Sequence, residues 1–434
     1  MSHENKNLFD LYFEYVRDTE PPLIYHRWSL IASVGAFLGR QYWMPFGPTR
    51  IFANQYVMLI GNPGTRKSTA IKTSKRLLTS AGYKFFAAEK TTKEKFLLDL
   101  EGSEDEFNAY NQKPAGSKPG SLGARDVLKA LDLGFGEAEH DGIPKEVFIT
   151  ADEFNEFAGS GNIDFLSMLG ALWDWDDENA TYTQRFKNSK SISIYQPTIS
   201  LISGNTHVGF QNAFPAAAIG QGFLSRLILV YSEPSGRKIT FPKAPSEEIA
   251  VAIAERFHQI REQVTGPAKI SEAAERALDT IYRTWKDLDD YRFKNYSTRR
   301  FPHLLKLCLV VTAMRVSTEI DLQDVILANT ILTWTEASMD KALGEYGKSR
   351  NAEAVQTIMS ALYSSKEPMN MEELWKLVRR DLEDRSKLPD ILNGLQAAGK
   401  IQFHKETGKF LPIQQAPNET APYVDFNLLK EYRF

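Results

Sequence analysis

A short apolar run that breaks into a glycine-containing loop and then a helix constrains this chain more than any other stretch. The run is Tyr56–Ile60, and Gly61-Asn-Pro-Gly-Thr-Arg-Lys-Ser68 follows it directly. We expect the run to be a buried strand and a helix to begin at Ser68. In such a strand–loop–helix unit, backbone N–H groups of the loop and of the helix N-terminus point at an anion. The segment is therefore a candidate phosphate-binding loop.

Individual loop residues have defined roles under this interpretation. The residues expected to surround the phosphates of ATP are Gly61, Asn62, Pro63, Gly64, Thr65, Arg66, Lys67, Ser68 and Thr69. Lys67 would contact the terminal phosphates, and Ser68 would place its hydroxyl on Mg²⁺. Arg66 departs from the usual pattern G-x-x-x-x-G-K-[ST], which has a glycine before the lysine. The alternative is an ordinary strand–turn–helix with a chance Lys-Ser pair.

A second apolar run, from Val147, ends in the adjacent carboxylates Asp152 and Glu153. Beside a phosphate-binding loop these two side chains have distinct roles. Asp152 would hold Mg²⁺ through the water shell of the metal, and Glu153 would polarise the attacking water. Alone, an acidic pair usually just caps a helix, but its place at the end of an apolar strand favours the Walker B element.

Three more apolar runs predict buried strands, at Tyr83–Ala88, Thr198–Ser203 and Leu227–Tyr231. Asn205 follows the second run, where a polar side chain can sense the γ-phosphate or orient the attacking water. Arg226 precedes the third, where it either reaches the nucleotide of a neighbouring subunit or makes a structural salt bridge. Strands separated by helices predict an α/β fold with a parallel sheet covered on both faces.

Alternating residues on both sides of the polar turn Lys187-Asn-Ser-Lys190 predict a β-hairpin from Tyr182 to Tyr195. Two lysines, Lys187 and Lys190, lie at its tip as candidate DNA contacts. A hairpin that is merely solvated is the alternative.

The remainder of the chain is predominantly helical. Four amphipathic helices are expected at Glu247–Val264, Ser271–Tyr291, Phe301–Val316 and Leu322–Ala342. Three short helices and a hairpin are expected at Ala352–Tyr363, Asn370–Arg379, Pro389–Ala398 and 400–413. Three helices and a β wing describe a winged helix-turn-helix, which contacts DNA or protein. Basic residues such as Arg379 and Lys400 favour DNA.

Composition limits the partners and the compartment. The 434-residue chain carries a net charge of −3, so any nucleic-acid contact must be a local basic feature. Its single cysteine, Cys308, excludes an internal disulfide and a cysteine-based metal site. With no signal peptide and no apolar run of transmembrane length, we expect no membrane contact and a cytoplasmic location.

From Pro22 to about Ala342 the chain resembles an MCM-like AAA+ ATPase of the phage and plasmid replication type. The segments that carry this resemblance are Gly61–Ser68, Ile149–Phe154, Gly204-Asn205, Leu224–Arg226 and Thr298-Arg299 at the start of a Leu-rich helix. The chain departs from larger members in having neither an N-terminal oligonucleotide-binding domain nor a zinc-binding cysteine set.

The resemblance implies Asn205 as sensor 1, Arg226 as an arginine finger and Arg299 as a sensor 2 arginine from a helical lid. It also implies a homo-hexameric ring with Lys187 and Lys190 on a pore hairpin. The expected domains are an N-terminal helical segment (1–54), a P-loop AAA+ core (55–240) with a surface insertion (103–143), an α-helical lid (241–348), a winged helix (349–413) and a tail (414–434).

The function expected from these features is that of an ATP-dependent DNA helicase. It would use Mg²⁺ and ATP to act on single-stranded or forked DNA during replication of a phage or mobile element. Its partners would include other replication proteins, and its location would be the bacterial cytoplasm if a phage encodes it. Two alternatives remain: an AAA+ helicase loader or remodeller that acts on a protein, and a nucleotide-switched winged-helix DNA-binding regulator.

Overall fold

A computed structural model provides the structure of the chain. The residues that it describes are 6–102, 143–175, 181–185, 191–214, 222–344, 354–355, 357–359, 361–362, 368–380, 382, 384–397, 401–404, 407–412 and 421–432. The chain divides into two compact units: unit 1 is Met1–Gly344 with Pro422–Phe434, and unit 2 is Glu345–Ala421. Lys187, Lys190 and the expected insertion up to residue 142 lie outside the described residues.

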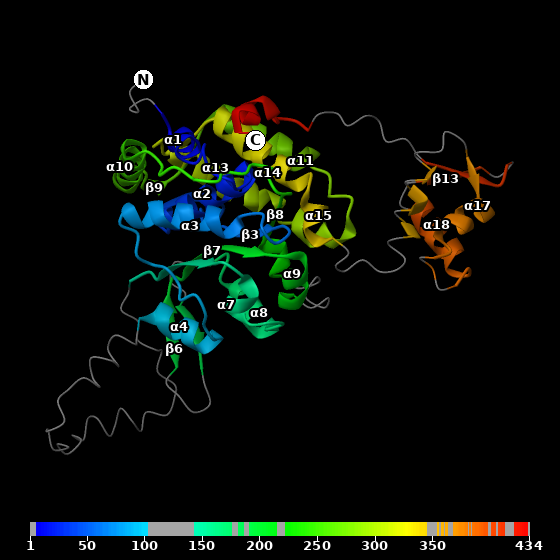
Figure 1. Ribbon diagram of the computed structural model, residues 1–434, viewed down its shortest axis with the longest axis horizontal. Helices are drawn as coiled ribbons and strands as arrows, with labels where there is room; N and C mark the ends of the chain where they lie inside the picture. The colour runs from blue at the N-terminus through cyan, green and yellow to red at the C-terminus, as the bar shows by residue number, and fades with distance from the viewer. Residues whose placement is uncertain are drawn as a thin grey trace, which may run out of the picture. The chain divides into compact units, whose positions relative to one another are not determined.

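Unit 1 is built on a four-stranded parallel sheet with the order β4-β7-β3-β8 (Figure 1). Its strands are β3 (Tyr56–Ile60), β4 (Glu146–Ala151), β7 (Thr198–Asn205) and β8 (Ile228–Tyr231). Every residue of the two central strands, β3 and β7, is buried, as near-continuous apolar runs between two helical layers require. The prediction of an α/β fold with a parallel sheet is confirmed.

Helices cover both faces of this sheet (Figure 1). On one face lie α2 (Leu23–Leu38) and α3 (Lys67–Ser80), and on the other lie α7 (Phe154–Ala158), α8 (Ile163–Ala171) and α9 (His207–Ala213). Nearly all of α2 is buried, because it lies between the sheet and further helices, which include α1 (Leu8–Tyr15) and α10 (Glu247–Gln263). The helix that opens at the phosphate-binding loop is confirmed, one residue earlier than predicted.

The segment Tyr83–Ala88 is not a strand, contrary to the prediction. A single bridge joins Phe86 to Phe148 of β4. The aromatic side chains of the segment instead pack on one another and on the sheet: Tyr83 contacts Phe86 and Phe148 with ring centroids 5.2 and 6.5 Å apart. Buried aromatic residues thus produce the same apolar pattern as a strand does. After this segment comes α4 (Lys93–Glu101).

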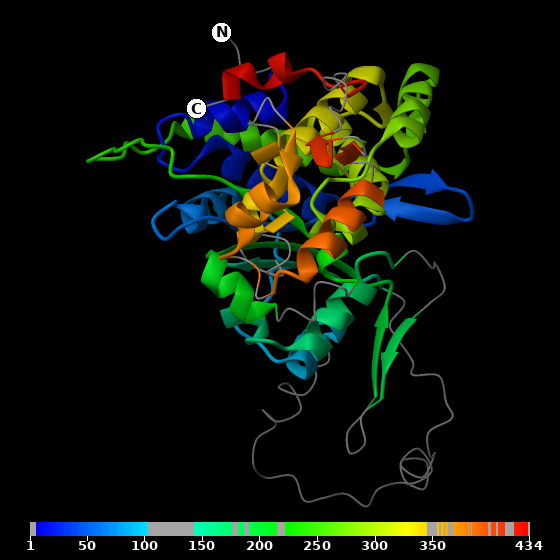
Figure 2. The same ribbon diagram turned by 90° about the vertical axis from the view of Figure 1, so that its right-hand side faces the viewer.

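Two antiparallel hairpins project from the body of unit 1 (Figure 2). The first, β1 (Tyr42–Phe46) with β2 (Thr49–Phe52), was not predicted, and β9 (Gly266–Pro267) pairs with β1. The second, β5 (Thr181–Gln184) with β6 (Ile192–Tyr195), confirms the strands of the predicted hairpin.

A helical layer follows β8. Its elements are β10 (Lys269–Ile270), α11 (Glu272–Thr284), η4 (Tyr291–Phe293), α12 (Lys294–Ser297), α13 (Arg300–Met314), β11 (Glu319–Ile320), α14 (Leu322–Glu336) and α15 (Met339–Leu343). Asp321 caps α14 in a capping box with Asp324. The predicted helix 322–342 is interrupted between α14 and α15, and the predicted helix from Ser271 ends at Thr284 rather than Tyr291.

Unit 2 has its own apolar core, which includes Leu374, Leu392 and Phe410. Its named elements are β12 (Met369–Asn370), α17 (Met371–Val378), α18 (Lys387–Ala397), β13 (Ile401–His404) and β14 (Lys409–Pro412).

The C-terminal segment, with η5 (Phe426–Tyr432), belongs to unit 1. It docks on α14, because the Asn329 side chain donates to the carbonyls of Pro422 and Tyr423 at 3.1 and 3.2 Å.

Candidate functional site

Lys67, Asp152, Glu153 and Asn205 converge at the carboxyl edge of the parallel sheet. Ile60 pairs with Asn205, and Ala151 pairs with Ser203, so three adjacent strands end side by side. The carboxyl ends of parallel strands are where open α/β sheets bind ligands. We call Gly61–Thr69, Asp152, Glu153 and Asn205 the carboxyl-edge site.

Arg66 occupies the left-handed backbone region, with φ +63°, immediately before α3. This conformation explains why the usual loop pattern has glycine at the same position. The side chain of Arg66 is anchored, since its Nε lies 2.7 Å from Oε2 of Glu20. Glu20 also accepts the N–H of Ile239, and this hydrogen bond, together with the Arg66 charge, keeps the pKa of Glu20 below its ordinary value. The departure from the usual pattern is thus accommodated by an ion pair to the N-terminal segment.

Gly61 begins the loop at a point where no side chain fits. A Cβ there would lie 2.5 Å from the Tyr25 hydroxyl and 2.8 Å from the carbonyl oxygen of Ser232. The Tyr25 hydroxyl lies 2.7 Å from the carbonyl oxygen of Ile60 and 3.0 Å from that of Ser232. Tyr25 therefore ties α2 to the ends of β3 and β8 and fixes where the loop starts.

Lys67 is folded back onto its own loop. Its Nζ donates to the carbonyl oxygens of Gly61 and Asn62 at 2.8 and 3.1 Å, and to the Thr65 hydroxyl at 3.1 Å. Burial lowers the pKa of Lys67, and the charge of Glu153 opposes this shift. Phosphate oxygens are stronger acceptors for an ammonium than neutral carbonyls are, so the lysine is positioned to exchange one set for the other.

The two carboxylates of the acidic pair have different surroundings. Oδ2 of Asp152 lies 2.5 Å from Nζ of Lys72, which is on α3. Glu153 is exposed at the start of α7, and its charge acts on Lys67. Gly204 lets β7 approach closely, since a Cβ there would lie 2.6 Å from the carbonyl oxygen of Asp152.

Asn205 presents an unpaired donor to this site. The residue is 1% exposed, and its Oδ1 accepts the N–H of Thr206 at 3.0 Å. Its Nδ2 is buried and has no hydrogen-bond partner among the described residues. The Asn205 carbonyl accepts the N–H of Gly61 at 3.4 Å, which places the residue beside the loop. A buried amide donor without an acceptor is costly, so the site fits a ligand that supplies an oxygen, as a phosphate does.

Arg226 lies at the opposite, amino edge of the sheet. It ends η3 (Leu224–Arg226), and Ile228, which begins β8, pairs with Val57. Gly61 comes four residues after Val57, about 13 Å further along the sheet, while Arg226 lies beyond the other end. The structure therefore does not bring Arg226 to the phosphate-binding loop of its own chain.

Arg299 shares the amino edge with Arg226 and lies close to the carboxylate of Asp174. Arg299 Nη1 lies 3.3 Å from Asp174 Oδ2, and Lys306 Nζ lies 3.7 Å from Asp174 Oδ1. Burial and then the charge of Arg299 lower the pKa of Arg226, whereas Asp174 raises it. We call Asp174, Arg226, Arg299 and Lys306 the amino-edge cluster.

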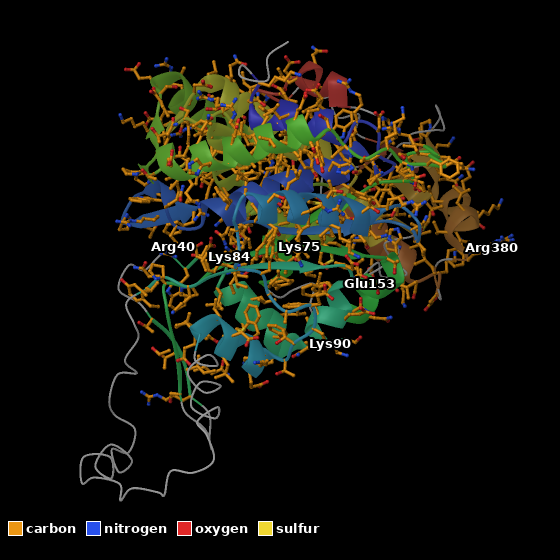
Figure 3. All side chains as sticks on the ribbon, turned by 60° about the vertical axis from the view of Figure 1, so that its left-hand side comes forward. Arg40, Lys75, Lys84, Lys90, Glu153 and Arg380 are labelled. Carbon is orange, nitrogen blue, oxygen red and sulfur yellow. The ribbon has the colours of Figure 1, made fainter. Side chains whose placement is uncertain are left out.

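Figure 3 shows how far apart the two edges are. Glu153 marks the carboxyl edge, and Arg40 lies at the other end of the sheet. Arg40 belongs to the amino edge because it donates to the carbonyl of Trp175 at 2.9 Å and to the hydroxyl of Thr198, the first residue of β7, at 3.3 Å.

The sequence motifs named the residues of the carboxyl-edge site, but they did not identify the residues that hold its loop in place. Ser68 is half-buried in the first turn of α3, and Thr69 is exposed there. Glu20, Tyr25 and Asp174 were missed, because their partners are distant in the sequence and no local motif marks them. The only local signal for Asp174 is its place between two tryptophans.

Comparison with known proteins assigns no family. Neither the models of protein families nor the curated proteins gave a match to this chain. In the part of the chain that the structure describes, no helix combines the length and apolar character needed to cross a bilayer.

Proposed function

We propose that this protein is an ATP-dependent DNA helicase, a ring-forming AAA+ motor that acts in DNA replication. The observation that carries the proposal is the convergence of Lys67, Asp152, Glu153 and the unpaired amide of Asn205 at one edge of a parallel sheet. A phosphate-binding loop, an acidic pair and a polar sensor are the parts that phosphoryl transfer to water requires.

Each residue of the carboxyl-edge site has a role in this proposal. ATP would arrive with Mg²⁺ and supply the γ-phosphoryl group. Lys67 would exchange the carbonyls of its loop for phosphate oxygens, and Asn205 Nδ2 would donate to an oxygen near Gly61. Asp152 and Ser68 would hold Mg²⁺ once Asp152 leaves Lys72. Glu153, exposed at the mouth of the site, would orient the attacking water.

The separation of the two edges supports a multi-subunit motor. Arg226 and Arg299 would stabilise charge on a phosphate, but the phosphate-binding loop of their own chain lies at the far end of the sheet. We therefore assign both arginines to the nucleotide of a neighbouring copy. The hexameric number rests on the family resemblance alone.

The DNA contact is assigned to Lys187 and Lys190, which lie in the sequence between β5 and β6 and outside the described residues. Lys187→Ala/Lys190→Ala should keep basal ATP hydrolysis and lose both the stimulation by single-stranded DNA and the unwinding of a forked duplex. Each lost phosphate contact should also flatten the log–log salt dependence of single-strand affinity by roughly 0.7. Lys238→Ala/Lys243→Ala, which removes two exposed lysines elsewhere, is the matched control. If the control variant unwinds the fork and Lys187→Ala/Lys190→Ala does not, the assignment is supported. If both variants unwind it, the assignment is contradicted.

A second candidate is an ATPase that remodels or loads a protein partner. The observation that favours it is a set of exposed apolar side chains on unit 2: Met371, Leu377 and Phe403 are 39, 42 and 36% exposed. Strand displacement by the purified protein alone would separate the two, because a loader needs its partner before any duplex opens.

A further inference from the structure

Among the described residues, the amino-edge cluster has three cations and one carboxylate. Arg299 and Lys306 lie next to the carboxylate of Asp174, whose side chain is 42% exposed, and the charge of Asp174 also acts on Arg226. The distances from Asp174 to Arg299 and Lys306, 3.3 and 3.7 Å, are long for ion pairs, as expected of one carboxylate that is shared.

The Arg226 guanidinium has an N–H donor for which the described residues supply no acceptor. Its Nη1 donates to the carbonyl of Gly222 at 2.6 Å, while its Nε is buried and has no hydrogen-bond partner in the described ranges. A guanidinium offers five N–H donors in a fork that matches phosphate oxygens. The cluster therefore has both the charge and the free donors to accept an anion larger than one carboxylate.

Lys306 is the buried cation of the cluster. Its side chain is 2% exposed, and Nζ donates to Asn54 Oδ1 at 2.7 Å and to the carbonyl of Phe52 at 3.1 Å. These two acceptors would remain if Asp174 moved away or lost its charge. The buried ammonium of Lys306 would thus keep two hydrogen bonds when Asp174 exchanges partners.

We propose that Asp174 is a resident counter-ion of the two arginines and that a phosphate group displaces it. In an isolated subunit Asp174 holds Arg299 and attracts Arg226. When the nucleotide of a neighbouring copy approaches, its phosphate oxygens take over both guanidiniums, and Asp174 withdraws. This inference rests on the proposed assignment of the arginines to a neighbouring nucleotide. It makes Asp174 a positioning residue that sets how readily subunits engage.

The test uses inorganic phosphate as the probe and the full chain carrying Lys67→Ala, so that the phosphate-binding loop contributes as little as possible. The thermal unfolding midpoint of dilute protein is followed against phosphate concentration at constant ionic strength. Asp174→Asn should reach a given shift in the midpoint at about ten-fold lower phosphate concentration, because one negative charge within ion-pair distance is removed. Asp174→Glu should restore the parental value, and Arg226→Ala should abolish the gain.

The matched control is Asp164→Asn, since Asp164 is an exposed carboxylate paired with Lys93 at 2.6 Å on another part of unit 1. Lys306→Met should act in the opposite direction to Asp174→Asn, because it removes a competitor for Asp174 and a positive charge from the cluster. A response of Asp174→Asn no larger than that of Asp164→Asn, or no phosphate response in any variant, would overturn the inference.

A second measurement separates this inference from the proposed function. With Lys67 intact, Asp174→Asn should self-associate in ATP at about ten-fold lower protein concentration than the parent does. If the parent shows no ATP-dependent association at all, the assignment to a neighbouring copy fails, while the phosphate titration still decides whether Asp174 is a displaceable counter-ion. Association of the parent and Asp174→Asn at the same concentration contradicts the role of Asp174 in engagement.

Discussion

The two edges of the parallel sheet differ in the charged groups that they carry. The carboxyl edge combines a lysine, two carboxylates and a buried amide around a loop that fits phosphates. At the amino edge, Arg226, Arg299 and Lys306 are the described cations on which the carboxylate of Asp174 acts. A catalyst of phosphoryl transfer needs both sets, since charge spreads over the transferred group in the transition state.

Under the proposed function, this separation means that one chain alone does not form a complete catalytic site. Parallel strands keep their two ends about a strand length apart, so packing within one chain cannot bring the edges together. Each edge also has a resident counter-ion: Lys72 lies 2.5 Å from Asp152, and Asp174 lies 3.3 Å from Arg299. Under the proposed function, both ion pairs would have to break when a nucleotide is bound between two copies.

The largest expected effect comes from removing the amino edge while keeping the carboxyl edge. Arg226→Ala should lower ATP turnover by on the order of 10³-fold, the contribution expected of an arginine supplied in trans. Mixing it with Lys67→Ala subunits should restore part of the activity, because some interfaces then combine two intact halves. Steady-state ATP hydrolysis across mixing ratios measures this. If each mixture shows only the average activity of the two inactive proteins, Arg226 acts in the site of its own subunit or has a structural role.

A second, smaller effect tests the carboxyl edge alone. Glu153→Gln removes the base and keeps the shape of the side chain, so ATP binding should persist while hydrolysis falls by about 10²-fold. Binding by equilibrium fluorescence and single-turnover hydrolysis are the two measurements. Glu156→Gln, an exposed acid one turn later on α7, is the control and should leave turnover unchanged. Near-normal hydrolysis by the Glu153 variant would show that another group activates the water.

The counter-ion at the carboxyl edge should have a weaker influence than either catalytic residue. Lys72 and Asp152 are 61 and 43% exposed, and exposed ion pairs contribute little. Lys72→Met should lower the Mg²⁺ concentration for half-maximal hydrolysis by about two- to five-fold, because Asp152 is released for the metal. Lys75→Met is the control, since Lys75 lies over the Phe86 ring instead. Equal Mg²⁺ requirements in both variants would remove Lys72 from the site.

The smallest effect concerns the backbone of the loop. Arg66→Gly restores the usual glycine at φ +63°, so relief of left-handed strain should roughly cancel the flexibility that glycine adds to the unfolded chain. The free energy of unfolding should change by less than about 1 kcal/mol, and ATP affinity by less than about two-fold. Arg66→Val should lose both stability and affinity, because a β-branched residue disfavours this conformation. Chemical denaturation and nucleotide titration measure the pair. If glycine is as damaging as valine, the Arg66–Glu20 ion pair matters more than the conformation.

Local sequence patterns were enough for the sheet and for most of the carboxyl-edge site. The apolar runs at Tyr56–Ile60 and Thr198–Asn205 are buried parallel strands, and the residues that follow such strands meet at one edge by topology alone. The same reasoning failed at Tyr83–Ala88, where aromatic packing gives an apolar run without a strand. It also overlooked β1 and β2, whose residues are mostly half-buried or exposed and carry a weak pattern.

Motifs made of contiguous residues could be recognised from the sequence. They are the loop from Gly61 to Thr69 and the pair Asp152-Glu153. Their chemistry depends on neighbours in the sequence and on the strand that precedes them. The supports of the site and the amino-edge cluster are different, because they join residues that are far apart, such as Glu20 with Arg66 or Asp174 with Arg299. No periodicity or spacing encodes such a pair. Only the packing of α2, α8 and α13 against the two ends of the sheet decides which charges meet there.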